Sequence, residues 1–138
     1  MRLTVRNFHG KLYFIPLGFL VLDVLFMFYF LSTNNKTAGQ YAFVFCTAGI
    51  ITGWISFLTG AIALIIIRKN SVAAGIAFVH GIINSVALMV LTMLWIKTWQ
   101  VYPQVQVPGT STVFFKLLMI AMLSVGIYLG KTSIAKHL

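Results

Sequence analysis

Residues 41–67 read YAFVFCTAGIITGWISFLTGAIALIII, a run without a charged residue that stops at the basic pair Arg68-Lys69. A helix that crosses a bilayer needs about 20 consecutive, mostly apolar residues. This run exceeds that length and therefore predicts a transmembrane helix. Its single Cys46 has no second cysteine in the chain to pair with, so we interpret it as a small core residue.

Three further apolar runs flank this one, at about residues 12–32, 72–96 and 113–130, and polar stretches at 33–40, 68–71 and 98–112 separate the four. No small-residue cleavage site follows the first run, so we expect it to remain as a spanning helix. The longest connection, TWQVYPQVQVPGTST, is predicted to be a loop because it holds two prolines and a glycine. We therefore predict an all-α, integral-membrane four-helix transmembrane bundle that forms a single domain over residues 1–138.

The composition excludes several classes of protein. Of the 138 residues, 60% are hydrophobic and 8% are charged, whereas a soluble domain carries about a quarter charged residues. Disorder requires the opposite balance of hydrophobicity and charge. The chain has one acidic residue, no Ser-His-Asp set, no phosphate-binding glycine loop and no zinc-type Cys/His spacing, so we expect no enzymatic activity from it alone.

The ten basic residues predict an orientation. If the four runs alternate in direction, one side of the membrane receives seven of them and the other receives three, 7 + 3 = 10. The seven are Arg2, Arg6, Lys11, Arg68, Lys69, Lys131 and Lys136, and the three are Lys36, Lys97 and Lys116. Basic loops stay inside, so we expect both termini in the cytoplasm and the protein in the cytoplasmic membrane. Trp95, Trp99 and Tyr102 would then form an aromatic belt on the outer side.

Small residues recur at steps of three or four residues, on one face, in three of the predicted helices. The sets are Gly49, Gly53, Ser56 and Gly60; Ala73, Ala77 and Gly81; and Gly126 with Gly130. Such steps let two helix backbones approach closely inside a membrane. They are consistent with packing within the bundle, with a dimerisation face or with a cleft for a flat cofactor.

Asp23 lies about halfway along the first run and is the chain's single acid. We count Lys116 with the basic residues of the outer side, and we find no Lys or Arg inside any other span that could neutralise Asp23. We therefore expect a largely protonated carboxyl, or one bonded to a polar side chain from another helix: Asn84, Ser56, Thr59 or His80. The alternatives are a structural hydrogen bond across helices, a proton-handling group and a contact with a partner subunit.

His80 lies about two turns into the third run, and Asn84 follows it on the same helix face. His9 precedes the first run, so chain direction brings both histidines toward the same side of the membrane. Each is followed by a glycine, Gly10 or Gly81, which leaves room beside the imidazole. Haem iron commonly takes axial histidine, and basic residues pair with its propionates.

We accordingly consider His80 and His9 as ligands of a haem iron, with Asn84 and Gly81 completing the cofactor-binding set. Basic residues expected on the same side of the membrane could pair with the haem propionates, and they are Arg2, Arg6, Lys11, Arg68 and Lys69. The difficulty is depth, because His9 lies about 10 Å nearer the membrane surface than His80 unless the first helix begins before it. We expect His137 to make surface contacts alone.

The chain resembles an uncharacterised bacterial four-helix membrane family, the domain of unknown function 2231. The resemblance covers nearly the whole chain and rests on His9 with Phe14–Gly18 (FIPLG), on Gly53–Gly60 (GWISFLTG), on His80–Asn84 (HGIIN) and on a glycine-rich fourth helix. The family pattern has a second histidine shortly before the proline, where this chain has Phe14. His9 and His80 are the positions that match, and the resemblance implies for them a possible ligand role in a bacterial membrane. Some relatives occur with Rieske-type domains, so the resemblance implies an association with redox complexes.

These observations together predict a small integral-membrane subunit of an electron-transfer complex, with b-type haem or quinone bound through His9 and His80. The alternative is a cofactor-free accessory subunit that braces a larger membrane complex through its glycine faces and its outer loop. A proton or solute path through Asp23 is a third interpretation, weakened by the lack of a second acid. In each case the expected partners are the lipid bilayer and other membrane subunits or further copies of the chain, and no nucleic acid.

Overall fold

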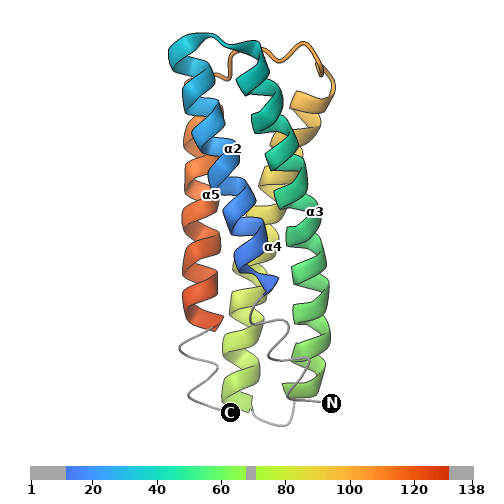
Figure 1. Cartoon of the computed structure of the whole chain (residues 1–138). Helices are drawn as coiled ribbons and strands as arrows, with labels where there is room; N and C mark the ends of the chain where they lie inside the picture. Colours follow the sequence, from blue (N-terminus) through green and yellow to red (C-terminus); the bar gives the residue numbers. More distant parts are fainter. Residues whose placement is uncertain (1–11, 68–70, 131–138) are drawn as a thin grey trace.

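The computed structural model of the chain describes residues 12–67 and 71–130, and these form a bundle of long helices (Figure 1). The helices are α2 (Phe14–Thr33), α3 (Lys36–Ile67), α4 (Ser71–Trp99) and α5 (Thr110–Leu129). They run alternately up and down, so that the start of α2 and the end of α5 lie at the same end of the bundle. This confirms the all-α four-helix prediction, and the described residues include no strand.

Each of these helices is long and apolar enough to cross a membrane. The 20 residues of α2 and of α5 extend over about 30 Å at 1.5 Å per residue, which matches the hydrocarbon thickness of a bilayer. The 32 residues of α3 and the 29 of α4 are longer and continue past that thickness. Figure 1 shows this difference at the lower end, where α3 and α4 reach beyond α5.

The turn between α2 and α3 is tight. Asn34 adopts the left-handed conformation with φ 54°, and its N–H donates to the carbonyl of Phe30 at 2.8 Å. The side-chain oxygen of Asn35 accepts from the N–H of Thr37 at 3.0 Å, as an N-cap does. This cap starts α3 at Lys36, five residues before the predicted start, so residues 36–40 are helical and not the loop that their polarity indicates.

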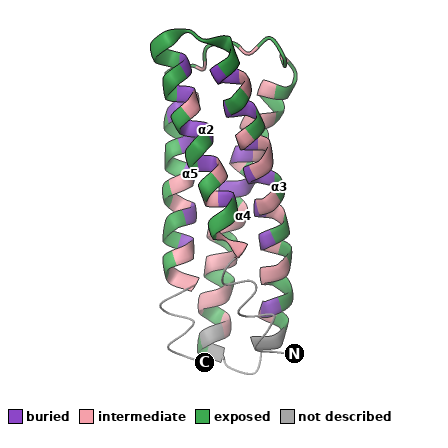
Figure 2. Ribbon diagram, viewed as in Figure 1, coloured by how far each residue is buried: buried purple, intermediate pink, exposed green. Residues whose placement is uncertain are grey.

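The buried residues follow the inner surfaces of the four helices, while the outward surfaces expose large apolar side chains (Figure 2). One core cluster includes Leu20, Cys46, Leu88 and Leu91, each at most 2% exposed. Exposed side chains such as Leu25, Ile65 and Phe114 suit contact with lipid tails, because helices that are apolar all round occur as membrane spans. Cys46 is a buried free cysteine, as the sequence indicates.

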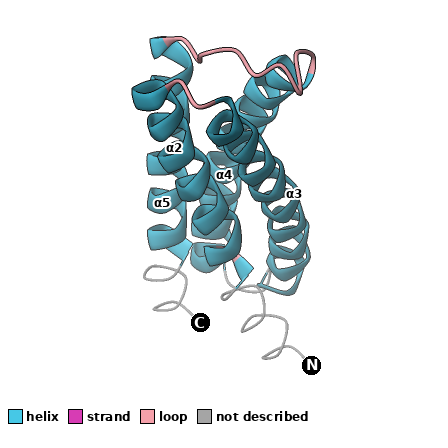
Figure 3. Ribbon diagram, turned by 45° about the horizontal axis from the view of Figure 1, so that its top comes forward, coloured by secondary structure: helices cyan, strands magenta, loops and turns pink. Residues whose placement is uncertain are grey.

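The connection from α4 to α5, residues 100–109, crosses one end of the bundle as an irregular loop (Figure 3). It is shorter than predicted because α4 continues to Trp99 and α5 already begins at Thr110. The side-chain amide of Gln40 donates to the carbonyl of Pro103 at 3.4 Å, which links the loop to α3. This arrangement distinguishes a loop end of the bundle, with the α2–α3 turn and residues 100–109, from the opposite end.

Candidate functional site

A buried ion pair joins α2 to α5 in the interior of the bundle. The ammonium of Lys116 donates to both carboxylate oxygens of Asp23, at 2.8 Å to Oδ1 and 2.7 Å to Oδ2. The side chains are 8% and 1% exposed, respectively. The thiol of Cys46 on α3 also interacts with both members of the pair. Three helices thus converge on one charged centre inside the membrane-spanning region.

This pair corrects the sequence analysis at two points. Lys116 lies inside α5 and is 7% exposed, so it is not a loop lysine, and Asp23 does have a basic residue at its depth. The hydrogen-bond partner of Asp23 is Lys116, not Asn84, Ser56, Thr59 or His80. Two opposite charges that bond to each other in the low-dielectric interior avoid the cost that an isolated carboxylate would carry there.

A cavity of about 230 Å³ lies beside this pair at the loop end, and we call it the loop-end cavity. Its apolar wall includes Phe30, Phe43 and Trp95, and its polar lining includes Lys97, Gln106 and Lys116. Residues 105–109 of the α4–α5 loop contribute to its lining. The sequence alone does not indicate this cavity, because its walls come from all four helices and the loop.

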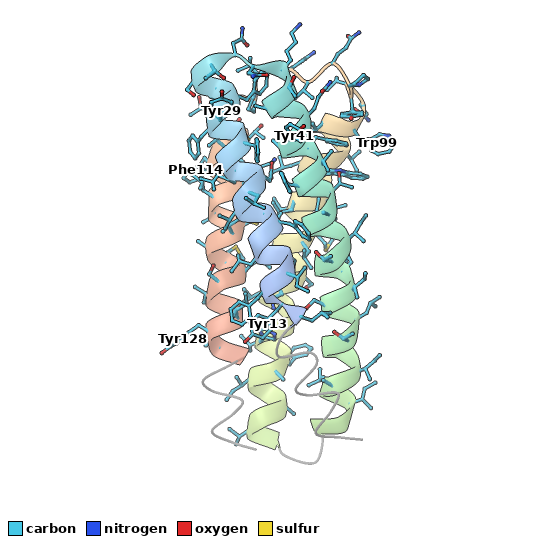
Figure 4. All side chains as sticks on the ribbon, viewed as in Figure 1. Tyr13, Tyr29, Tyr41, Trp99, Phe114 and Tyr128 are labelled. Atoms are coloured by element: carbon cyan, nitrogen blue, oxygen red, sulfur yellow. The ribbon has the colours of Figure 1, made fainter. Side chains whose placement is uncertain are left out.

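Aromatic contacts hold the wall of this cavity in place. The ring of Phe43 stacks on those of Trp95 and Tyr102, with centroids 6.1 Å and 4.5 Å apart. The indole N–H of Trp95 donates to the hydroxyl of Thr47 at 2.7 Å. The predicted aromatic group of Trp95, Trp99 and Tyr102 therefore lies at the loop end and ties α3 to α4 and the loop. Figure 4 shows Trp99, Tyr41 and Tyr29 at this same end, with Tyr13 and Tyr128 toward the other.

His80 lies away from the loop end, where α4 contacts the last turn of α5. Its Nδ1 is 2.6 Å from the carbonyl oxygen of Gly126, so Nδ1 carries the proton and donates it to that oxygen. The amide nitrogen of Asn84 is 3.3 Å from Nδ1 and 3.2 Å from Nε2. One atom at nearly the same distance from both ring nitrogens cannot lie in the ring plane along the N–H of Nδ1 and the lone pair of Nε2 at once, so this nitrogen lies over the face of the imidazole.

Gly126 in α5 and Gly130, the residue that follows it as the C-cap, make room for these polar side chains. A Cβ on Gly126 would collide with the side-chain oxygen of Asn84, and one on Gly130 would lie 3.2–3.5 Å from three atoms of the His80 ring. Gly81, by contrast, has nothing within 4 Å of its Cβ position, so one side of the imidazole's own helix is open. The buried side-chain oxygen of Asn84 has no hydrogen-bond partner among the described residues.

Two further glycines of the predicted packing set, Gly49 and Gly53, also face neighbouring helices. A Cβ on Gly49 would lie 2.8 Å from Cγ of Leu20 on α2, and one on Gly53 would lie 2.5 Å from a methyl group of Leu88 on α4. Gly60 is half-buried. Gly49, Gly53, Gly126 and Gly130 thus all support close approach within the chain, one of the alternatives that the sequence leaves open.

The structure describes part of the predicted haem set. His80, Asn84 and Gly81 are placed as above, while His9, His137 and the basic residues Arg2, Arg6, Lys11, Arg68 and Lys69 lie outside the described residues. Within the described part, no three His, Cys, Asp or Glu side chains come together as a metal-binding group. His80 and Asp23 are not in contact, so the bundle holds two separate polar centres.

Residues 6–137 match the model of a family described as predicted membrane protein (DUF2231). The chain belongs to this family. The match covers almost the whole length, and it agrees with the four helices that can span a membrane. The family's description states a membrane protein and assigns no activity. Comparisons with curated proteins and with solved structures gave no match.

In this DUF2231 protein, the motif FIPLG (residues 14–18) forms the start of α2. Phe14, the first residue of that motif, is 52% exposed on the outside of the bundle. Pro16 is buried in the first turn of the helix, where its missing N–H costs nothing. The motif in α4 places His80 and Asn84 one turn apart, in the contact described above.

Proposed function

We propose that this DUF2231 protein is a small electron-transfer subunit of a membrane complex and that His80 is the ligand of its redox cofactor. The observation that carries the proposal is the 2.6 Å hydrogen bond from Nδ1 of His80 to the carbonyl of Gly126. Histidines that bind metals usually donate their other ring N–H to a carbonyl or carboxylate, which fixes the tautomer and the ring orientation. In this role the chain carries electrons and catalyses no reaction alone.

The tautomer favours haem over quinone. With the proton on Nδ1, the neutral ring offers a lone pair on Nε2, which can bind iron but cannot donate a hydrogen bond to a quinone carbonyl. The described residues provide no in-plane partner for this lone pair, because Asn84 lies over the ring. The orphaned oxygen of Asn84 adds a buried polar atom that a bound group or water can satisfy. His80 would therefore hold the iron of a b-type haem through Nε2, which supports haem as the cofactor.

His9 is the second ligand in this proposal. It precedes α2, whose first turn lies at the end of the bundle toward which His80 is placed. The basic residues that the sequence assigns to this side, Arg2, Arg6, Lys11, Arg68 and Lys69, would pair with the propionates. The haem itself would supply the one-electron chemistry. The protein would orient it through His80, hold that imidazole neutral and exclude water with the apolar helices.

The test is a dithionite-reduced minus oxidised visible spectrum of the purified protein, before and after haem is added. We expect a sharp α-band in the wild type and its loss in His80→Ala, because the iron would lose an axial ligand. His137→Ala is the matched control, since it removes another imidazole that has no role in the proposal, and it should keep the band. A band that survives in His80→Ala, or a wild type that remains colourless with added haem, would overturn the proposal.

A flat spectrum would favour the alternative of a cofactor-free accessory subunit. Gly49, Gly53, Gly126 and Gly130 contact neighbouring helices of the same chain, so such a subunit would dock through other surfaces. The exposed apolar surfaces of the four helices and the outer loop are then the places to search for a partner.

A further inference from the structure

The loop-end cavity includes one positive charge, that of Lys97, which no acidic side chain of this protein is available to neutralise. Asp23 is the single acidic residue in the sequence, and both of its carboxylate oxygens already bind Lys116. Lys97, which is exposed at the rim of the cavity, therefore has no carboxylate side chain available to it. The cavity consequently has a net charge of about +1 from its side chains.

The interior of the cavity combines this charge with apolar surface. Phe30, Phe43 and Trp95 form the wall, while Lys116 lines the buried side and Lys97 the exposed side. Lys116 donates to both carboxylate oxygens of Asp23 and also interacts with the thiol of Cys46, so its ammonium is already engaged. The cavity thus offers a cation at its rim and aromatic surface in its wall.

We propose that the loop-end cavity binds a small organic anion, namely a carboxylate with a short apolar body. The carboxylate pairs with Lys97, and the apolar body lies against the ring of Trp95. The volume of about 230 Å³ is below the 300–1,000 Å³ of pockets that take drug-sized ligands, so the ligand is a short chain and not a long one. This site lies apart from His80 and does not depend on the proposed haem.

The test uses Trp95 as the reporter, because a bromine atom in contact with an indole quenches its fluorescence. The protein is placed in nanodiscs of zwitterionic phosphatidylcholine and titrated with bromohexanoate, and with bromohexanol as the neutral partner of equal length. We expect saturable quenching by the acid and weaker, unsaturated quenching by the alcohol. Trp95→Phe should remove the saturable part, since Trp54 and Trp99 do not line the cavity.

Two lysine variants decide whether the charge acts as proposed. Lys97→Gln should weaken the apparent affinity for bromohexanoate by about three- to tenfold, the effect of one partly exposed charge-assisted bond. Lys36→Gln is the matched control, because Lys36 is also an exposed lysine at the loop end but does not line the cavity. Equal quenching by acid and alcohol, or an equal loss in both lysine variants, would overturn the proposal.

A final arm separates a free carboxylate from a lipid head group, which has the same anionic chemistry. The titration is repeated in discs that contain phosphatidylglycerol. Unchanged affinity supports the free carboxylate. A Lys97-dependent loss of bromohexanoate binding would show that the lipid head group occupies the cavity, and it would overturn the assignment to a free acid.

Discussion

At the residue scale, the ion pair between Asp23 and Lys116 is the most consequential feature of the bundle. Each charge alone would be expensive in a membrane interior, and together they form two hydrogen bonds at 2.7–2.8 Å between α2 and α5. The pair therefore specifies which helices are neighbours. Asp23 is 0% exposed and Lys116 is 7% exposed, so solvent screens the interaction little.

Replacing only one member of this ion pair should destabilise the fold more than replacing both members together. We expect Asp23→Leu and Lys116→Met each to lower the free energy of unfolding by about 3 kcal/mol, because each leaves one buried charge without a partner. The double variant should recover much of that loss, since two apolar side chains would fill the same space. Unfolding of purified protein in mixed micelles of mild detergent and dodecyl sulfate measures this cycle.

Lys36→Met serves as the control for loss of a lysine charge, because Lys36 is exposed at the start of α3, and it should change the unfolding free energy little. If the losses of the two single variants simply add in the double variant, the pair contributes no coupling and its proposed role in helix pairing is wrong.

The limits of sequence reasoning are clearest at these residues. Lys116 lies near the start of its span, so a count of loop charges assigns it to the loop, although it points inward from the first turns of α5. A single acid in an apolar run was the signal that a basic partner was needed. The contact of His80 with Asn84 could be predicted from their spacing of one helical turn. The hydrogen bond of His80 to the backbone carbonyl of Gly126 could not, because every residue has such a carbonyl and the sequence does not show which one accepts.

At the scale of the helices, long apolar runs in the sequence predict that each helix exists and that it can span a membrane. They do not predict the residues at which each helix begins and ends. Helix α3 starts at Lys36 and α4 continues through Lys97 to Trp99, so polar residues at both places are helical. Hydropathy locates the part inside the lipid, whereas a cap such as Asn35 sets where the helix begins. The predicted ends therefore fall three to five residues short at these places.

Close approach of α2 and α3 depends on Gly49. A Cβ there would lie 2.8–2.9 Å from two side-chain atoms of Leu20 and 3.4 Å from its backbone nitrogen. Leu20 is fully buried and cannot move aside cheaply. We expect Gly49→Val to lower the unfolding free energy by about 1–3 kcal/mol through overpacking, measured in the same mixed micelles.

Gly18→Val is the matched control for this substitution, because Gly18 is on the exposed side of α2 and has nothing within 4 Å of its Cβ position. It should alter stability by about 0.5 kcal/mol or less. Equal effects at Gly18 and Gly49 would mean that helix propensity, and not the contact with Leu20, determines the cost.

At the scale of the whole molecule, the bundle has two chemically different ends. The loop end holds the cavity, the ion pair and the aromatic cluster, while His80 lies toward the end where α5 stops. Because Lys116 is buried inside α5, it no longer counts as a loop charge. The comparison of basic residues becomes seven against two, 3 − 1 = 2, with Lys36 and Lys97 on the loop end.

This stronger asymmetry predicts that the loop end faces away from the cytoplasm, since basic loops remain inside. The test introduces single cysteines at Gln104, in the α4–α5 loop, and at Asn70, beside Arg68-Lys69, each in a Cys46→Ala background. A maleimide that cannot cross membranes should label Gln104→Cys on intact cells and Asn70→Cys after permeabilisation alone. The reverse pattern would place the loop-end cavity in the cytoplasm, so that an anion bound there would come from the cell interior and His80 would lie toward the outside. The same experiment therefore decides which compartment supplies each of the two sites.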